Sequence, residues 1–203
     1  MAIDVDQRVS APRRPGRCVF VASGTLPNVD GIRWFFESCW EQIRARVPHA
    51  HLEIYGTICL RLDSVPENVT LMGFSHELTE IFSGATVAIA PLLAGSGLKL
   101  KVVEAMAYGV PMVTTSIGAQ GLLDIQPAPF AVANEPGEFA DAVARMLTDD
   151  EEHARMVRAA RGAAPRFSTA RVFAPLEAAI ADDLESTRTT HTTSEQSVIA
   201  MSR

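Results

Sequence analysis

The chain has 203 residues, of which 47% are hydrophobic and 21% are charged, and its formal net charge is −6. This composition is typical of a globular protein, and the length suffices for one full core or for one domain with tails. The acidic balance argues against a nucleic-acid-binding protein, which usually carries a basic face, and no stretch approaches the ~20 apolar residues of a membrane span.

The first part of the chain predicts a linker, a strand and a long helix. Residues 1–16 contain arginines and prolines without periodicity, and we expect a linker or a disordered N-terminus there. A buried strand is expected at 18–22, and the glycine-containing turn after it ends at Asn28, which can cap the next helix. That helix carries an apolar face up to Val47, and we interpret its aromatic residues as core rather than as a stacking platform.

The rest of the chain alternates between short apolar runs and helical segments. Further strands are expected at 52–56, 69–73, 87–90, 111–115 and 130–132. Helices are expected at 76–83, 98–109, 136–148, from the acidic run 149–152 onward, and at 168–184. We therefore expect one domain over 17–184 and a disordered, Ser/Thr-rich tail over 185–203.

The order of these elements predicts the α/β class. We expect a Rossmann-like, doubly wound, mostly parallel six-stranded sheet with helices on both faces. Ligands of such sheets bind beyond the carboxyl ends of the strands, near the point where the strand order reverses. Glycine-bearing loops follow the first, fourth and fifth expected strands and should converge there, which favours a phosphate-bearing ligand.

The stretch from Pro91 to Gly109 is central to this prediction. Its turn, Gly95 to Gly97, lets a ligand approach the backbone closely, and the helix expected from Leu98 would point free N–H groups at that ligand. Lys99 and Lys101 add positive charge within reach of a phosphate. The alternative is that this is an ordinary strand–glycine–helix turn without a ligand, with solvated lysines on the first turn.

The three cysteines, Cys18, Cys39 and Cys59, each lie in or next to an apolar run. Their odd number, without a metal-binding spacing, predicts buried free thiols rather than a disulfide framework or a metal site. Free thiols are typical of a reducing compartment, and the N-terminus shows no apolar signal segment. We therefore expect a cytoplasmic protein.

Four segments together carry a resemblance to a known family. They are VASGTLPNVDGIRWF at 21–35, VTLMGFSHEL at 69–78, APLLAGSGLKLKVVEAMAYGVPMVTT at 90–115 and SIGAQGL at 116–122. Residues 17–182 resemble the C-terminal, nucleotide-sugar-binding half of a GT-B glycosyltransferase of family 4, the group 1 type. Such enzymes are usually retaining and need no metal or other cofactor. The resemblance also implies a UDP-, GDP- or other nucleotide-sugar as substrate.

The resemblance also implies roles for individual residues. Glu104 matches the last Glu of the E-x7-E signature, which binds the nucleotide ribose, and Gly73 with Phe74 matches the segment that meets the base. The glycine loop before the helix expected at 98–109 and the loop after the first expected strand both match segments that hold the diphosphate. The candidate donor-binding residues are Gly24, Thr25, Gly73, Phe74, Gly95, Ser96, Gly97, Leu98, Lys99, Lys101 and Glu104.

The sequence departs from the family pattern in three places. Ser96 stands where the first Glu of E-x7-E would contact the donor sugar, and the first-strand loop lacks the Arg and Lys that many members carry. We expect the acceptor-binding N-terminal half and its catalytic groups to lie outside residues 1–203, so we assign no catalytic residue within this chain. The five histidines are scattered and show no triad or metal spacing.

Two alternatives stand beside the glycosyltransferase. The first is a binding module that takes a nucleotide or sugar nucleotide without turning it over, and Ser96 favours it. The second is a dinucleotide-binding domain, although residues 23–28 lack G-x-G-x-x-G. The expected partners are the nucleotide-sugar donor and either the N-terminal acceptor half or a second copy of this chain. Any membrane contact would be made through the N-terminal half. The final helix should expose apolar side chains that such a partner covers, with Phe173 and Leu176 as candidates.

Overall fold

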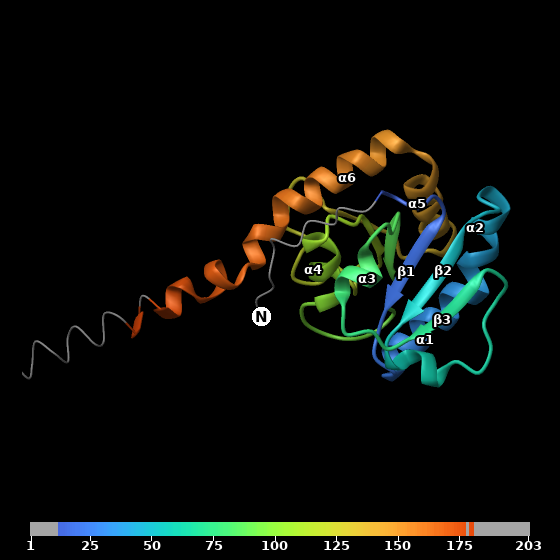
Figure 1. Cartoon of the computed structure of the whole chain (residues 1–203), viewed down its shortest axis with the longest axis horizontal. Coiled ribbons are helices and arrows are strands. Elements are labelled where there is room, and N and C mark those ends of the chain that lie inside the picture. The colour runs from blue at the N-terminus through green and yellow to red at the C-terminus, as the bar shows by residue number, and fades with distance from the viewer. Residues whose placement is uncertain (1–11, 178, 181–203) are drawn as a thin grey trace, which may run out of the picture.

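The computed structural model describes residues 12–177 and 179–180. Its centre is a six-stranded sheet in the order β3-β2-β1-β4-β5-β6, and all five strand pairings are parallel (Figure 1). The strands are β1 (Arg17–Val21), β2 (His51–Tyr55), β3 (Val69–Gly73), β4 (Val87–Ala90), β5 (Met112–Thr114) and β6 (Phe130–Val132). The expected doubly wound, Rossmann-like α/β fold is confirmed, and the sheet is entirely rather than mostly parallel.

The helices form two layers, one on each face of the sheet. On one face Phe20 and Ile54 pack with α1 (Leu26–Phe35), α2 (Glu41–Arg46) and α5 (Pro136–Thr148). On the other face Val19 and Ala88 pack with α3 (Leu78–Phe82), α4 (Leu100–Ala107) and α6 (Asp150–Ala163). Figure 1 shows α1 with α2 and α3 with α4 on opposite sides of the strands. Successive β1 side chains enter different cores because side chains alternate along a strand.

The strand order reverses between β1 and β4. From β1 the chain runs outward through β2 to β3, and then returns across β1 to begin β4 on its other side. α1 leaves β1 on one face of the sheet and α4 leaves β4 on the other. The carboxyl ends of β1 and β4 therefore form the switch point, the place at which doubly wound sheets bind ligands.

The first long helix differs from its prediction in its beginning and in its interior. Asn28 is not its cap: α1 begins at Leu26, and Thr25 occupies the N-cap position without a side-chain cap. A π-helical turn, η1 (Phe36–Trp40), separates α1 from α2, so the predicted single helix is three segments. The aromatic residues are confirmed as core, since Phe35 is fully buried and lies edge-on to Phe139 with ring centroids 5.8 Å apart.

Two other local features were not predicted correctly. The helix expected from Leu98 begins two residues later, because Lys99 has extended backbone and is the N-cap of α4. A 3-10 helix, η2 (Thr57–Arg61), follows β2 where no helix was expected. The end of α4 was predicted correctly, since Gly109 has a φ of +65° directly after the helix.

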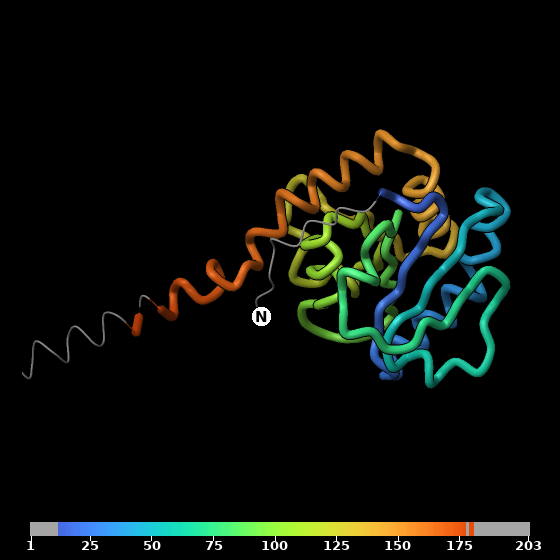
Figure 2. The backbone as a smooth tube through the Cα atoms, viewed as in Figure 1, coloured from blue at the N-terminus to red at the C-terminus, as the bar shows by residue number. Residues whose placement is uncertain are grey.

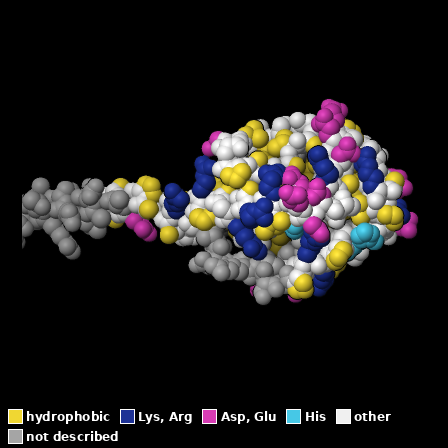
Figure 3. Space-filling view, turned by 90° about the horizontal axis from the view of Figure 1, so that it is seen from above, with side chains coloured by type: hydrophobic (Ala, Val, Ile, Leu, Met, Phe, Trp, Pro, Cys, Tyr) yellow, Lys and Arg dark blue, Asp and Glu magenta, His cyan; other side chains and the backbone are white. Residues whose placement is uncertain are grey.

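The C-terminal part continues from α6 through η3 (Ala164–Phe167) into a helical segment at 169–177 that leaves the body of the domain (Figure 2). Phe173 and Leu176 on this segment are 41% and 55% exposed, as expected, and Figure 3 shows hydrophobic side chains along it. Of the expected linker, Arg14 donates its amide to Gly84, so this end lies against the domain. The predicted tail at 185–203 and most of the predicted linker lie outside the described residues.

The three cysteines are free, as predicted, and Cys18 and Cys39 are buried, whereas Cys59 is only partly buried. Within the described ranges, no helix is long and apolar enough to cross a membrane.

Candidate functional site

The loops after β1, β4 and β5 lie side by side at the carboxyl edge of the sheet. Gly31 of α1 packs against the loop after β4, where a Cβ at position 31 would stand 2.2 Å from the carbonyl oxygen of Pro91. Thr115, after β5, donates its hydroxyl to the carbonyl oxygen of Leu92 and accepts the amide of Gly118 at 3.2 Å. These contacts fix the three loops relative to one another.

The loop after β1 is held by two side chains from outside it. The amide of Gly24 donates to Oγ1 of Thr57 at 3.0 Å, so this N–H is already used by η2. Asn28 reaches back from α1, and its Nδ2 donates to the carbonyl oxygen of Ser23 and to Oγ1 of Thr25, each at 3.0 Å. The resemblance places Gly24 beside the phosphates, and in this structure its backbone amide has a protein partner instead.

The loop after β4 presents its backbone to solvent. Gly95 and Gly97 have φ values of +123° and +73°, a region that favours glycine, and residues 93–98 are exposed. Within the described part of the chain, the amides of residues 95–98 donate no hydrogen bond to protein. Lys99 folds back, and its Nζ donates to the carbonyl oxygen of Gly97 at 2.7 Å. Free amides on a glycine-rich loop before a helix can bind an anion.

Lys101 extends from the first turn of α4 across the switch point. Its Nζ donates to Oδ1 of Asn28 at 2.7 Å and lies 4.8 Å from the ring centroid of Phe20. Burial lowers the pKa of Lys101 to about 8, an effect that the charge of Glu104 opposes and that of Lys99 reinforces. Glu104 lies one turn further along α4 and is half-buried, and burial raises its pKa while Lys101 lowers it.

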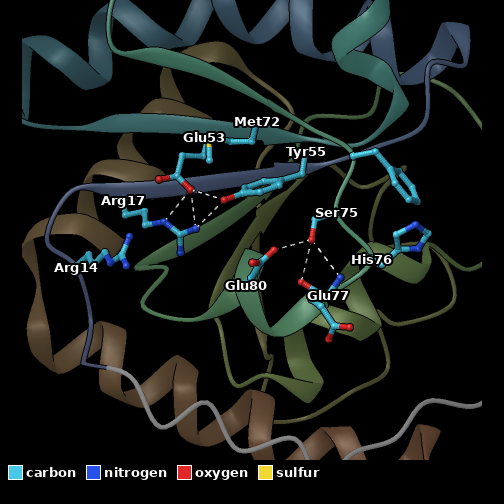
Figure 4. Close-up of a pocket in the computed structure, with 10 residues that line it drawn as sticks. Arg14, Arg17, Glu53, Tyr55, Met72, Ser75, His76, Glu77 and Glu80 are labelled. Carbon is cyan, nitrogen blue, oxygen red and sulfur yellow. Dashed lines mark hydrogen bonds and ion pairs between the residues drawn. The ribbon is translucent and has the colours of Figure 1, made fainter.

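Gly73 and Phe74 lie at the end of β3, two strands away from the switch point. Phe74 is 63% exposed, and its ring meets that of His76 edge-on at 4.6 Å. Phe74 lines a cavity of about 530 Å³ that also touches side chains of β1, β2, β3 and α3 (Figure 4). It is lined by Arg14, Arg17, Glu53, Tyr55, Met72, Phe74, Ser75, His76, Glu77 and Glu80.

A buried ion pair forms the floor of this cavity. Nη2 of Arg17 lies 2.6 Å from Oε2 of Glu53, and the Tyr55 hydroxyl donates to the same oxygen at 2.7 Å (Figure 4). Burial raises the pKa of Glu53, but the hydrogen bonds from Arg17 and Tyr55 and the charge of Arg17 outweigh it, so the pKa lies below its ordinary value. Because Arg17 also donates to the carbonyl oxygen of Ser83, these groups satisfy one another and act as a structural cluster.

The structure thus divides the predicted site residues into two groups. The first-strand loop and the segment from Gly95 to Glu104 meet at the switch point, whereas Gly73 and Phe74 lie at the outer end of the same edge. Sequence reasoning took Asn28 for a helix cap and so missed its bonds to Ser23 and Thr25. It missed Thr57 because no local signal pairs Gly24 with a residue 33 positions away. Among the described residues, no three His, Cys, Asp or Glu side chains form a group that could hold a metal ion.

The fold is that of a doubly wound α/β domain, a class whose ligands bind at the carboxyl ends of the strands near the switch point, here the ends of β1 and β4. Residues 17–149 match the family described as "Glycosyl transferases group 1". The chain therefore belongs to the group 1 glycosyltransferases.

A curated relative and two solved structures extend this comparison. An uncharacterized 44.6 kDa protein in the cps region of Klebsiella pneumoniae is 28% identical over 134 residues, which cover 60% of this chain and 34% of that protein. TarM of S. aureus matches with a TM-score of 0.70 and 16% identity, over 87% of this chain and 37% of TarM. The pneumococcal O-GlcNAc transferase GtfA, in complex with UDP and GlcNAc, matches with a TM-score of 0.67 and 17% identity, over 90% of this chain and 38% of GtfA. The chain thus spans about a third of the length of these relatives.

Proposed function

We propose that this chain is the donor-binding, C-terminal half of a family 4 glycosyltransferase of the GT-B fold. The observation that carries the proposal is the switch point of a group 1 glycosyltransferase domain, where free loop amides, Lys101 and Glu104 come together. Free amides and an ammonium group suit a diphosphate, and a carboxylate one turn further along the helix suits the hydroxyls of a ribose. The structure of GtfA with UDP and GlcNAc supports a nucleotide-sugar as donor.

The proposed donor lies along the carboxyl edge of the sheet. Its diphosphate meets the amides of Gly97, Leu98 and Lys99, and its ribose meets Glu104. Its base extends toward Gly73 and Phe74, whose position at the end of β3 leaves room along the edge. Reaction with retention of configuration and without a metal ion is part of this proposal, which rests on the family resemblance. Free, buried cysteines support a location in the cytoplasm.

Transfer requires an acceptor held against the donor, with reacting atoms about 3–3.5 Å apart. We propose that a separate N-terminal half supplies the acceptor site, because the matched relatives are almost three times as long as the matched segment. The exposed apolar side chains at 169–180 support a partner at this end of the domain.

A non-catalytic binding module is the second candidate function. Ser96 replaces the carboxylate that would recognise the donor sugar, and the Gly24 amide is donated to Thr57. A domain of this kind would bind a nucleoside diphosphate but would not discriminate its sugar.

Calorimetry and a transfer assay separate these possibilities. The 203-residue chain is titrated with UDP, GDP and ADP, and then with the sugar-bearing form of the nucleotide that binds. We expect one diphosphate to bind and the chain alone to transfer no sugar, and we expect transfer once an N-terminal half is supplied. Absence of binding to all three nucleotides would contradict the donor site. Binding without transfer in the presence of that half would favour the binding module, and rapid transfer by the chain alone would contradict the missing-half proposal.

A further inference from the structure

The chain uses lysine at one place only. Its 18 Lys and Arg residues comprise 16 arginines and two lysines, and the two lysines are Lys99 and Lys101. Lys99 is the N-cap residue of α4, and Lys101 lies in the first turn of this helix, at the switch point. A lysine ammonium is a compact point charge, whereas a guanidinium is a broad planar group with a fixed arrangement of donors. The two lysines of the chain both lie where the loop after β4 enters α4, at the switch point.

Lys101 connects the two faces of the sheet at the switch point. Its side chain starts on α4, on one face, and its Nζ reaches Asn28 on α1, on the other face, at 2.7 Å. The Phe20 ring, on the face that carries α1, lies 4.8 Å away from the ammonium. One of the three ammonium hydrogens is used by Asn28, which leaves two for a ligand.

Asn28 divides its two polar atoms between two tasks. Its Nδ2 binds the first-strand loop through the backbone of Ser23 and the hydroxyl of Thr25, while its Oδ1 accepts from Lys101. An amide is suited to this arrangement because it donates and accepts without carrying a charge. The loop from Ser23 to Asn28 contains no cation of its own, so Lys101 is the cation brought to it.

We propose that Asn28 is a positioning residue that holds the ammonium of Lys101 across the switch point, so that Lys101 neutralises the diphosphate of the donor. This inference rests on the proposed function, and it adds a residue that acts through Lys101 rather than on the donor. Asn28 orients the ammonium and stabilises its charged form through the hydrogen bond to Oδ1. The amide leaves the positive charge available, which a carboxylate at the same position would cancel.

The charge state of Lys101 gives a direct test of this arrangement. Burial lowers its pKa to about 8, and the charged groups that act on it are Lys99 and Glu104 on its own side, while Asn28 and Phe20 opposite are uncharged. Removing the Oδ1 acceptor in Asn28→Ala should lower the pKa of Lys101 further. Placing a carboxylate there in Asn28→Asp should raise it.

The first experiment follows this pKa by NMR in the full chain labelled with ¹³C-lysine, which gives two lysine spin systems to assign. Wild type, Asn28→Ala and Asn28→Asp are titrated between pH 6 and 11. Thr57→Val serves as the matched control, because it removes the partner of the Gly24 amide and loosens the same loop without touching Lys101. We expect opposite shifts in the two Asn28 variants and none in Thr57→Val. An unchanged Lys101 pKa in both Asn28 variants would overturn the positioning role.

The second experiment measures affinity for UDP and uridine by calorimetry, with GDP or ADP and their nucleosides if those bind instead. Asn28→Asp should weaken diphosphate binding about 10- to 100-fold at every pH at which Lys101 is charged, because the carboxylate neutralises Lys101 and repels the ligand. Asn28→Ala should approach wild type only at a pH well below the lowered pKa of Lys101, and with rising pH it should lose affinity earlier than wild type does. Nucleoside affinity should stay unchanged in both variants. If wild type binds no nucleotide, the proposed function fails, while the NMR result still decides whether Asn28 acts on Lys101. If wild type binds a diphosphate and neither Asn28 substitution changes the affinity, this inference alone is overturned.

Discussion

Gly31 of α1 lies so close to the loop after β4 that a Cβ at this position would stand 2.2 Å from the carbonyl oxygen of Pro91. The contact joins the helix that leaves β1 to the loop that leaves β4, the two elements that border the switch point. No side chain larger than a hydrogen fits without moving one of them, and both are backbone at the point of contact.

Gly31→Ala should therefore destabilise the domain by about 1–3 kcal/mol, the usual cost of overpacking a well-packed site. In a domain of this size, each kcal/mol lowers the melting temperature by about 2–4 °C, which calorimetry or thermal circular dichroism resolves. Gly137→Ala is the matched control, since no heavy atom lies within 4 Å of the added Cβ and the residue is in α5. The control should be neutral or stabilising, and equal losses in both variants would contradict the packing argument.

Glu104→Ala should weaken the binding of nucleoside and nucleoside diphosphate alike, because the proposed contact is to the ribose that both share. A hydrogen bond to a charged group contributes about 1.5–3 kcal/mol, which corresponds to a loss of roughly 10- to 100-fold in affinity measured by calorimetry. Glu37→Ala, on the exposed side of the π-helical turn, should leave affinity unchanged. An affinity in Glu104→Ala equal to that of wild type would remove Glu104 from this role.

Lys101→Ala should affect the diphosphate and spare the nucleoside. Its loss removes one positive charge from the switch point, so diphosphate affinity should fall and should depend less on salt concentration. Lys99→Ala should have a smaller effect, because Nζ of Lys99 is already bound to the carbonyl oxygen of Gly97 on an exposed loop. If neither substitution changes diphosphate affinity or its salt dependence, backbone amides alone hold the phosphates.

Glu53 should make the stability of the domain depend on pH. Its pKa in the folded state lies below its ordinary value, so the folded protein binds this proton less readily than the unfolded chain does. The resulting stability is complete above the unfolded-state pKa of about 4.3 and is lost as the pH falls through the folded-state pKa. Denaturant unfolding at a series of pH values should show this decline in wild type.

Glu53→Ala should remove that pH dependence and cost about 3–5 kcal/mol at neutral pH, because it leaves Arg17 buried without its carboxylate partner. Glu67→Ala is the control, since the Glu67 carboxylate is 75% exposed and pairs with Arg44 at the surface. Exposed pairs contribute about 0–1 kcal/mol. Similar losses in the two variants would show that burial of the Arg17–Glu53 pair does not matter.

The exposed apolar side chains of 169–180 should cause the isolated chain to self-associate. Phe173 and Leu176 are exposed on a segment that projects from the domain, an arrangement that favours burial against another surface. The double substitution Phe173→Ser, Leu176→Ser should shift the chain toward monomer in sedimentation velocity, whereas Glu177→Ser should not. A wild-type chain that stays monomeric at high concentration would contradict this prediction.

The sequence alone predicted the class of fold, which the structure confirms, and it predicted the edge of the sheet on which the candidate site lies. Short apolar runs and helical periodicity are local signals of burial, and they located all six strands and the α4 segment. Their alternation predicted a parallel sheet, and glycines after the first, fourth and fifth strands indicated the edge at which a ligand binds. The start of α4 was placed two residues early because Leu98 and Lys99 have good helix propensity, whereas in the structure Lys99 has extended backbone and is the N-cap of α4.

The tertiary structure alone decided which residues act together. Asn28 looked like a helix cap from its local sequence, and only the approach of α4 gives it Lys101 as a partner 73 residues away. Thr57 became the acceptor for Gly24 because η2 folds over the first-strand loop, and Glu53 met Arg17 because β1 and β2 are neighbours. Periodicity and composition report how a residue relates to its own element, but a contact between elements depends on the packing of the whole chain. The local sequence therefore predicted where the candidate site lies, while the fold determined its hydrogen bonds and the burial that lowers the pKa of Lys101.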